Sequence, residues 1–236
     1  SRPVIRGLEG SRVQILQNGL SVGDVSNISQ DHAVGNNLQN AHQVEILRGA
    51  AALLYGSGSS GGLVNVVNDR ILTNLPDRPT GSINTSYETV NNGRAGSLEV
   101  DGAYGSVAVH VDTAINNANN YRIPGSSTQS QGEPPGGWAV PPEGNGGNNY
   151  TGKLPNSFSN QNNLGVGVSY IGQNGYTGFS VERLNNNYGI PTPEGGSINQ
   201  SQNRYDLQHQ TRDPFSGFSS FKFSAANTNY NHTEFT

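Results

Sequence analysis

The chain has 236 residues and a formal net charge of −4, but only 32% of its residues are hydrophobic and only 13% are charged. Soluble globular domains average about 45–50% apolar and about 25% charged residues. The composition is therefore typical of a low-complexity chain, or of a β-protein in which apolar and polar residues alternate. The mean hydropathy of −0.58 does not argue against a membrane protein, because the strands of a transmembrane barrel face lipid with only every other residue.

Several classes of protein are excluded at this stage. The absence of cysteine excludes a disulfide framework and a thiolate metal site. A pI near 5.7 gives no signature of nucleic-acid binding. No apolar run approaches the ~20 residues of a transmembrane helix. The acidic residues are scattered without a clear acid/base pair, so we predict that the chain is not an enzyme and uses no catalytic cofactor.

The first part of the chain, up to about residue 74, predicts a compact mixture of short strands, turns and one helix. An apolar run ends at Asn18-Gly19, a typical turn dipeptide. The alanine-rich stretch before Gly56 favours a short helix, which the following glycines end. The predicted elements are strands at Val13–Leu16, Val44–Leu47 and Leu63–Val67 and a helix at Ala50–Tyr55.

The second part, residues 79–236, predicts about seven strands with period-2 alternation. They lie at Gly81–Thr89, Ser97–Tyr104, Val107–Ile115, Leu164–Tyr170, Thr177–Asn185, Arg204–Gln210 and Phe218–Asn229. Gly105-Ser106 alone separates the second strand from the third, which indicates a tight hairpin. Short turns alternate with long polar segments near 116–161 and 186–203, which is the loop pattern of an outer-membrane barrel.

The alternation also predicts which side chains face lipid and which face the barrel interior. Leu98 and Val100 share one strand face, as do Val107, Val109 and Val111 on the next strand. The polar residues of the opposite faces are Glu99, Asp101, His110 and Asp112. We expect the apolar set to face lipid and the polar set to face the lumen.

Three segments of the first part, Pro3–Gly7, Val13–Gly19 and Val44–Val66, contain recognisable motifs. In these segments the chain resembles the plug domain of TonB-dependent receptors. Pro3–Gly7 is similar to the P-x-I-R-G element of that family, and Val13–Gly19 is similar to its V-x-x-L-x-D-G strand and turn. The longest similar segment runs from Val44 to Val66. The family pattern there is V-E-V-x-R-G-P, followed by a short helix that ends at L-Y-G and by G-G-x-I-N-I. This chain has Ala50 where the family usually has proline. The residues that carry the plug motif are Arg6, Gly7, Glu45, Arg48, Gly49, Tyr55, Gly56, Gly61 and Gly62.

This resemblance implies a fold and a location. The fold is a membrane β-barrel, 22-stranded when complete, with an inserted α+β plug, of which this chain holds the plug (residues 1–74) and the first strands of the barrel (residues 79–236). The location is the bacterial outer membrane. The implied partners are the lipid bilayer and the TonB energy-transducing complex, which would contact a segment N-terminal to Ser1. The charges of Glu45 and Arg48 are candidates for ion pairs that anchor the plug to the barrel.

Within this superfamily the chain most resembles the zinc-uptake receptors of the ZnuD type. Ser29–Ala33 is similar to their S-P-D-H-A plug loop, and Tyr230–Glu234 is similar to a Y-x-H-x-E strand end that supplies a barrel carboxylate. The resemblance implies Zn(II) as the transported ligand and Asp31, His32 and Glu234 as its ligands, with His232 as a further candidate. Imidazole and carboxylate are suitable ligands for zinc. The His-rich extracellular loop of that family is absent, because 186–203 contains no histidine.

Other functions stay open at this stage. A siderophore or haem receptor has the same plug motifs. A structural or adhesive β-protein would explain the Asn- and Gly-rich segments but not the plug motif, and a β-solenoid hydrolase would need coil-length repeats that the sequence lacks. We therefore expect energised uptake of a scarce ligand across the outer membrane, with Zn(II) as that ligand.

Overall fold

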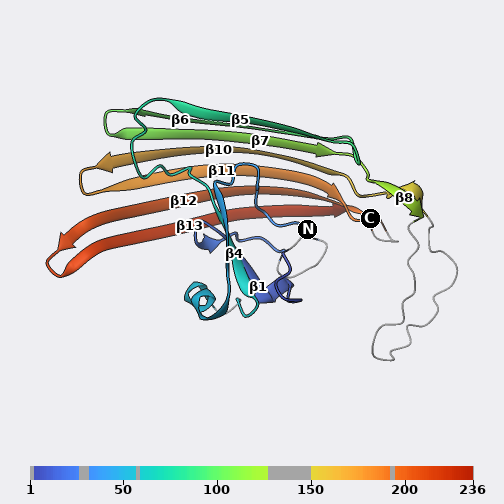
Figure 1. Cartoon of the computed structure of the whole chain (residues 1–236), viewed down its shortest axis with the longest axis horizontal. Coiled ribbons are helices and arrows are strands. Elements are labelled where there is room, and N and C mark those ends of the chain that lie inside the picture. Colours follow the sequence, from blue (N-terminus) through green and yellow to red (C-terminus); the bar gives the residue numbers. More distant parts are fainter. Residues whose placement is uncertain (1–2, 27–31, 57–58, 127–149, 192–194, 236) are drawn as a thin grey trace.

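The computed structural model describes residues 3–26, 32–56, 59–126, 150–191 and 195–235. Two main β-sheets make up most of this structure, one of four strands and one of seven. Figure 1 shows the seven-stranded sheet as a long curved wall, with the four-stranded sheet lying against one of its faces. No helix among the described residues has the length and the apolar character needed to cross a membrane.

The four-stranded sheet belongs to the plug part of the chain and has the order β2-β1-β4-β3. Its elements are η1 (Gly10–Arg12), β1 (Val13–Gln17), β2 (Leu20–Ser21), β3 (Gln43–Leu47), η2 (Gly49–Tyr55) and β4 (Gly62–Val67). The three predicted strands are therefore confirmed, while the predicted helix is a 3-10 helix. Leu16, Ala52 and Leu63 form a small buried core between these elements, with Leu47 packed against it.

Two adjacent glycines allow β4 to start close to its neighbours. A Cβ atom on Gly61 would lie 2.9 Å from Cβ of Leu8, and one on Gly62 would lie 2.8 Å from the carbonyl oxygen of Leu47. Gly62 also has a φ of 129°, which residues with a side chain rarely adopt. The plug motif thus needs glycine at both positions, because a side chain at either would collide with the neighbouring residues.

The seven-stranded sheet is antiparallel, with the order β13-β12-β11-β10-β7-β6-β5. Its strands are β5 (Thr80–Glu88), β6 (Gly93–Tyr104), β7 (Val107–Ala118), β10 (Ser159–Gly172), β11 (Gly175–Gly189), β12 (Ser197–Phe215) and β13 (Phe218–Phe235). All seven predicted strands are present, and the tight hairpin at Gly105-Ser106 is confirmed. The two edge strands of this sheet are β5 and β13.

The strands are longer than the alternation of apolar residues predicted. Asn- and Gln-rich sequence continues β11 to Gly189 and starts β12 at Ser197, so most of the expected loop at 186–203 is strand. The expected loop at 116–161 contains a two-stranded ribbon of β8 (Arg122–Ser126) and β9 (Thr151–Lys153). Asparagine and glutamine have low strand propensity, and the pairing of whole strands across the sheet overrides it here.

The two faces of the seven-stranded sheet differ as the alternation predicted. Val109 and Val111 of β7 are about two-fifths exposed on the outer face, as are Leu98 and Val100 of β6. His110 and Asp112, which alternate with these valines along β7, are buried on the inner face. The plug lies on this inner face, so buried polar side chains of the wall find their partners there.

Candidate metal centre

Two elements that are far apart in sequence bring the predicted metal ligands together. His32 lies in the plug loop that follows β2, and the hydroxyl of Tyr188 on β11 accepts a hydrogen bond of 2.8 Å from the next backbone N–H, that of Ala33. His232 and Glu234 lie near the end of β13 and, two residues apart, project from the same face of the strand. The plug and the barrel wall therefore each contribute to one cluster.

The three ligand atoms form a nearly equilateral triangle. Nε2 of His32 lies 3.2 Å from Nε2 of His232. Oε1 of Glu234 lies 3.1 Å from the first nitrogen and 3.4 Å from the second. In a tetrahedral zinc site with ligands about 2.0 Å from the ion, neighbouring ligand atoms lie about 3.3 Å apart. The three atoms thus match the edges of one face of such a tetrahedron.

The chemistry of this set favours a transition-metal ion. Two imidazoles and one carboxylate form the His₂Glu set of a zinc site that keeps its fourth position open. The two imidazole rings meet edge to face, with centroids 4.7 Å apart. His32 is buried, whereas the side chain of Glu234 is about half exposed, so the cluster is accessible from the barrel side.

The remaining predicted residues are placed as follows. Asp31, the fourth predicted ligand, lies outside the described residues. Arg6 and Gly7 form a tight turn with φ angles of 51° and 75°, closed by hydrogen bonds between the backbones of Ile5 and Leu8. Gly49 and Gly56 also have positive φ angles, at the two ends of η2. Tyr55, at the end of η2, lies beside the turn at Gly19.

Glu45 and Arg48, the two charges expected to anchor the plug, lie on β3 and directly after it. Glu45 accepts a hydrogen bond of 2.9 Å from Asn65 of the neighbouring plug strand. Arg48 is exposed. Glu45 thus contacts the neighbouring plug strand, and among the described residues the charged contacts between plug and wall come from other residues. The ion pairs expected of Glu45 and Arg48 stay a prediction.

Arg70, which the sequence analysis did not single out, is the central contact between plug and wall. Its guanidinium, itself buried, bonds to both carboxylate oxygens of Asp112 on β7 and lies 2.6 Å from Oε2 of Glu182 on β11. Burial alone would lower the pKa of Arg70, but the charge of Glu182 and the bonds to Asp112 raise it above its ordinary value. The only local signal was a charged pair, Asp69-Arg70, directly after the last plug strand.

Glycines of the wall make room for this arginine. A Cβ on Gly165 would overlap the side chains of Arg70 and Asp112, and one on Gly167 would overlap the carbonyl group of Arg70. Both glycines lie on β10, directly beside β7 in the sheet. The backbone of residue 70 therefore packs directly onto the backbone of the wall.

A second buried arginine, Arg204 of β12, reaches from the wall into the plug. It binds Asp206 on its own strand at 3.0 Å and donates a hydrogen bond of 2.7 Å to the carbonyl of Ser21. Gln17 of the plug donates to Glu182 at 3.0 Å. These contacts hold the plug to β11 and β12 through charged and amide groups.

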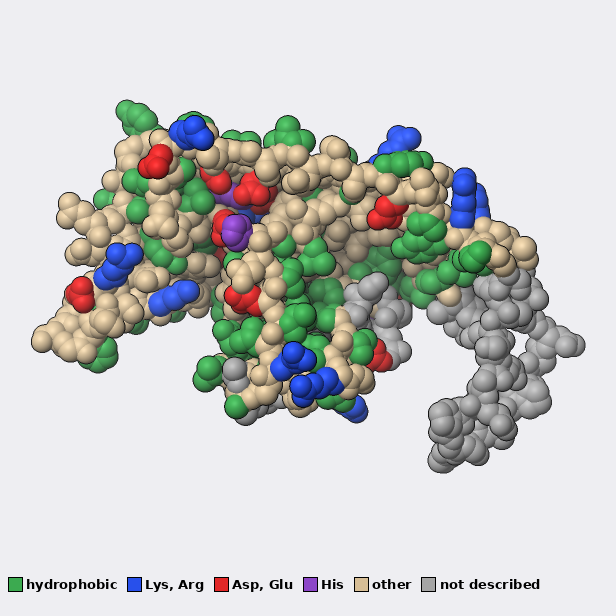
Figure 2. All heavy atoms as spheres, in the orientation of Figure 1, with side chains coloured by type: hydrophobic (Ala, Val, Ile, Leu, Met, Phe, Trp, Pro, Cys, Tyr) green, Lys and Arg blue, Asp and Glu red, His purple; other side chains and the backbone are tan. Residues whose placement is uncertain are grey.

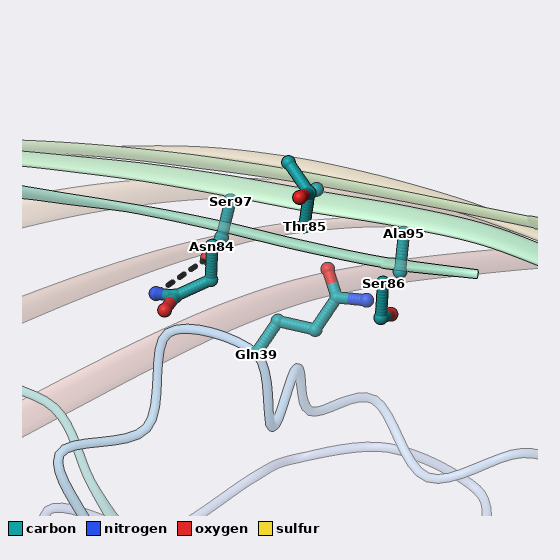
Figure 3. Close-up of a pocket in the computed structure, with 7 residues that line it drawn as sticks. Gln39, Asn84, Thr85, Ser86, Ala95 and Ser97 are labelled. Atoms are coloured by element: carbon teal, nitrogen blue, oxygen red, sulfur yellow. Dashed lines mark hydrogen bonds between the residues drawn. The ribbon is translucent and has the colours of Figure 1, made fainter.

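A small cavity lies between the plug and the first two strands of the wall. It has a volume of about 150 Å³ and is lined by Gln39 of the plug and by Asn84, Thr85, Ser86, Ala95, Gly96 and Ser97. Figure 3 shows Gln39 extending from its loop toward the residues of β5 and β6. The polar side chains that line this cavity are neutral amides and hydroxyls, which are poorer zinc ligands than imidazole and carboxylate.

The comparison with protein families agrees with the plug resemblance. Residues 1–63 match the family model described as TonB-dependent Receptor Plug Domain. The matched model describes a receptor plug, which is the domain that the resemblance of the first part of the chain implies.

Solved structures of the same architecture cover nearly all of the chain. The copper transporter OprC aligns with 98% of this chain at a TM-score of 0.70 and 15% identity. The FrpB iron transporter from Neisseria meningitidis aligns with 96% at a TM-score of 0.68 and 12% identity. The siderophore receptor PirA from Pseudomonas aeruginosa aligns with 97% at a TM-score of 0.60 and 18% identity.

The TM-scores establish a shared fold, and at identities this low they establish the fold alone. The alignments cover 32%, 34% and 35% of the three longer chains, so this chain spans about a third of the length of the structures it matches. The predicted barrel strands and inserted plug are confirmed. Residues 1–63 thus match the TonB-dependent receptor plug domain, and the whole chain has the fold of the plug and first barrel strands of such receptors.

Proposed function

We propose that this chain is part of a TonB-dependent transporter that takes up Zn²⁺ across the outer membrane. The ion binds between the plug and the wall, with His32, His232 and Glu234 as ligands and Asp31 as the fourth. The observation that carries this proposal is the convergence of two imidazole nitrogens and a carboxylate oxygen, 3.1 to 3.4 Å apart.

The origin of the ligands suggests how binding and release are coupled. One histidine belongs to the plug, while the other histidine and the glutamate belong to β13. Any movement of the plug relative to the wall separates His32 from the other two ligands. A pull on the plug by TonB would therefore dismantle the site and free the ion.

Copper is the strongest competing cargo. OprC, one of the structures with this fold, is named a copper transporter. Imidazole ligands suit copper as well as zinc, and the intrinsic order of affinities places Cu²⁺ above Zn²⁺. The absence of cysteine and methionine, the soft ligands that select Cu(I), favours zinc over Cu(I) in this chain.

The first test compares metal binding and uptake in the complete receptor. His32→Ala removes one of the ligands and should weaken Zn²⁺ binding roughly tenfold or more, measured by calorimetry in detergent. Growth on limiting zinc should slow, while growth on limiting iron stays normal. His209→Ala is the matched control, because His209 lies on β12 outside the cluster and pairs with Thr177.

The outcomes separate the competing functions. Normal zinc affinity and zinc-limited growth in His32→Ala would end the zinc proposal. Loss of growth on limiting copper, with zinc uptake unchanged, would assign the same cluster to copper. A growth defect only on iron chelates would assign the receptor to siderophores.

A further inference from the structure

A second group of metal-ligating side chains lies on the barrel wall, away from the first cluster. Glu99 and Asp101 project from β6 and His110 from β7, and one ligand atom of each lies within 4.8 Å of the other two. Nδ1 of His110 is 2.7 Å from Oδ1 of Asp101. Figure 2 shows histidine side chains (purple) next to acidic side chains (red) on the face of the molecule turned toward the viewer.

The surroundings of this second group are rich in negative charge. Asp112 lies 3.2 Å from Nε2 of His110, and Asp69 of the plug is close enough to interact electrostatically with Glu99. The nearby guanidinium of Arg70 is already bound by Asp112 and Glu182. Three carboxylates, those of Glu99, Asp101 and Asp112, thus lie close to the imidazole of His110, and Arg70 offsets only the last of them. The remaining negative charge of Glu99 and Asp101 favours a bound cation.

Access to the group is open from the plug side. His110 is buried, but Glu99 and Asp101 are partly exposed on the inner face of the wall. His42 and Asp69 of the plug, 3.2 Å apart, are both exposed. Movement of the plug would leave the three wall residues in place, because all three belong to paired strands of the sheet.

The two clusters lie toward opposite ends of the strands. The pairing register aligns His232 with Gln200, Asn186, Gln161 and Asn116 on successive strands. Asn116 and His110 are six residues apart on β7, which is roughly 20 Å along the strand. His110 is close to the tight hairpin at Gly105-Ser106, whereas His232 is close to the other end of the wall.

We propose that Glu99, Asp101 and His110 form a second divalent-metal site, which receives the ion after it leaves His32, His232 and Glu234. The role as a receiving site rests on the proposed function, while the binding site itself can be tested separately. One imidazole and two carboxylates bind Zn²⁺ with harder ligands than the first cluster does. In the bound state Nδ1 of His110 and Oδ1 of Asp101 both face the ion, and their mutual hydrogen bond is replaced by two bonds to metal.

The binding test counts and locates zinc ions in the complete receptor. After chelation and reloading with Zn²⁺ alone, elemental analysis should find two ions per protein, and anomalous scattering at the zinc edge should show one at each cluster. Glu99→Gln and His110→Ala should each weaken the second site roughly tenfold or more and leave the first ion bound. Glu88→Gln, the same change on the neighbouring strand, should keep both ions.

The transport test separates a receiving site from a chance metal site. Glu99→Gln should slow uptake of radioactive zinc into cells, while zinc affinity at the first cluster is unchanged. Absence of density near His110, or retention of both ions in Glu99→Gln, would overturn the second site. Normal uptake in a variant that has lost the second ion would overturn its role. An ion near His110 with none near His32 would instead contradict the proposed function and leave the second site standing.

Discussion

Arg70 shows how one side chain can hold the plug to the wall. A buried guanidinium is tolerated only when hydrogen bonds and opposite charges replace its lost hydration. Asp112 and Glu182 supply these, from strands 42 and 112 residues further along the chain. Asn40 of the plug adds a hydrogen bond of 2.6 Å to Asp112, so plug and wall share the same carboxylate.

Arg70→Ala should therefore destabilise the seating of the plug strongly. The change leaves the buried carboxylates of Asp112 and Glu182 without their main partner, which costs about 3–5 kcal/mol. Urea-induced unfolding of the plug in the complete receptor, followed by proteolysis, measures this loss. Arg48→Ala is the control, and this exposed arginine should change stability by only about 0.5 kcal/mol or less. Equal effects of the two changes would contradict the central role of Arg70.

At the scale of strands, the alternation of side chains divides the wall into two surfaces. On β10, Leu164, Val166 and Val168 are exposed, while the residues between them include glycines that contact Arg70. The register places Val166 beside Val111 of β7, and Val111 beside Val100 of β6. An apolar row thus crosses the outer face of three neighbouring strands, as expected for a surface in contact with lipid.

Val111→Arg tests this orientation. A charge at the lipid face near the bilayer midplane costs about 2–4 kcal/mol, and folding of the complete receptor into lipid vesicles would measure it. Ala103→Arg is the comparison, because Ala103 is exposed and shares the inner face of β6 with Glu99 and Asp101. The second change should cost much less. A larger cost at residue 103 than at residue 111 would reverse the assignment of the two faces.

At the scale of the whole molecule, the plug is joined to the wall by polar contacts rather than by an apolar core. The hydrophobic core of the described plug is small, and its contacts with β7, β10, β11 and β12 include hydrogen bonds and ion pairs, with the apolar side chain of Ile71 packed beside Gly178 of β11. Polar contacts can be exchanged for water when the plug moves, so such an interface is suited to opening and closing.

A crosslink between plug and wall should block transport without blocking binding. Nδ2 of Asn37 in the plug donates a hydrogen bond of 2.7 Å to Oδ1 of Asn163 on β10. The chain contains no cysteine, so Asn37→Cys with Asn163→Cys introduces one pair of thiols into it. Treatment with a short thiol crosslinker should stop zinc uptake and leave zinc affinity unchanged. Each single cysteine variant, treated in the same way, should transport normally. Uptake that continues after complete crosslinking would show that the ion passes without movement of the plug at this contact.

The sequence by itself determined the strands of this protein and the motif of its plug. Period-2 alternation is a local property, so residues such as Val107–Val111 reveal their two faces without knowledge of their neighbours. Gly61 and Gly62 likewise indicate from the sequence alone a place where the backbone takes a positive φ angle or approaches its neighbours closely. The extent of the strands was underestimated, because Asn- and Gln-rich segments such as that of β12 owe their extended form to their partners.

Only the tertiary structure decided which distant residues meet. His32 and His232 are 200 residues apart, and their juxtaposition depends on the register of β13 and on where the plug loop contacts the wall. A resemblance named these residues, but no periodicity or spacing could bring them together. Arg70 had even less signal, since its partners lie on two strands separated by a third, β10, against which the arginine packs. Long-range contacts of this kind arise from the packing of complete elements, which local sequence patterns do not encode.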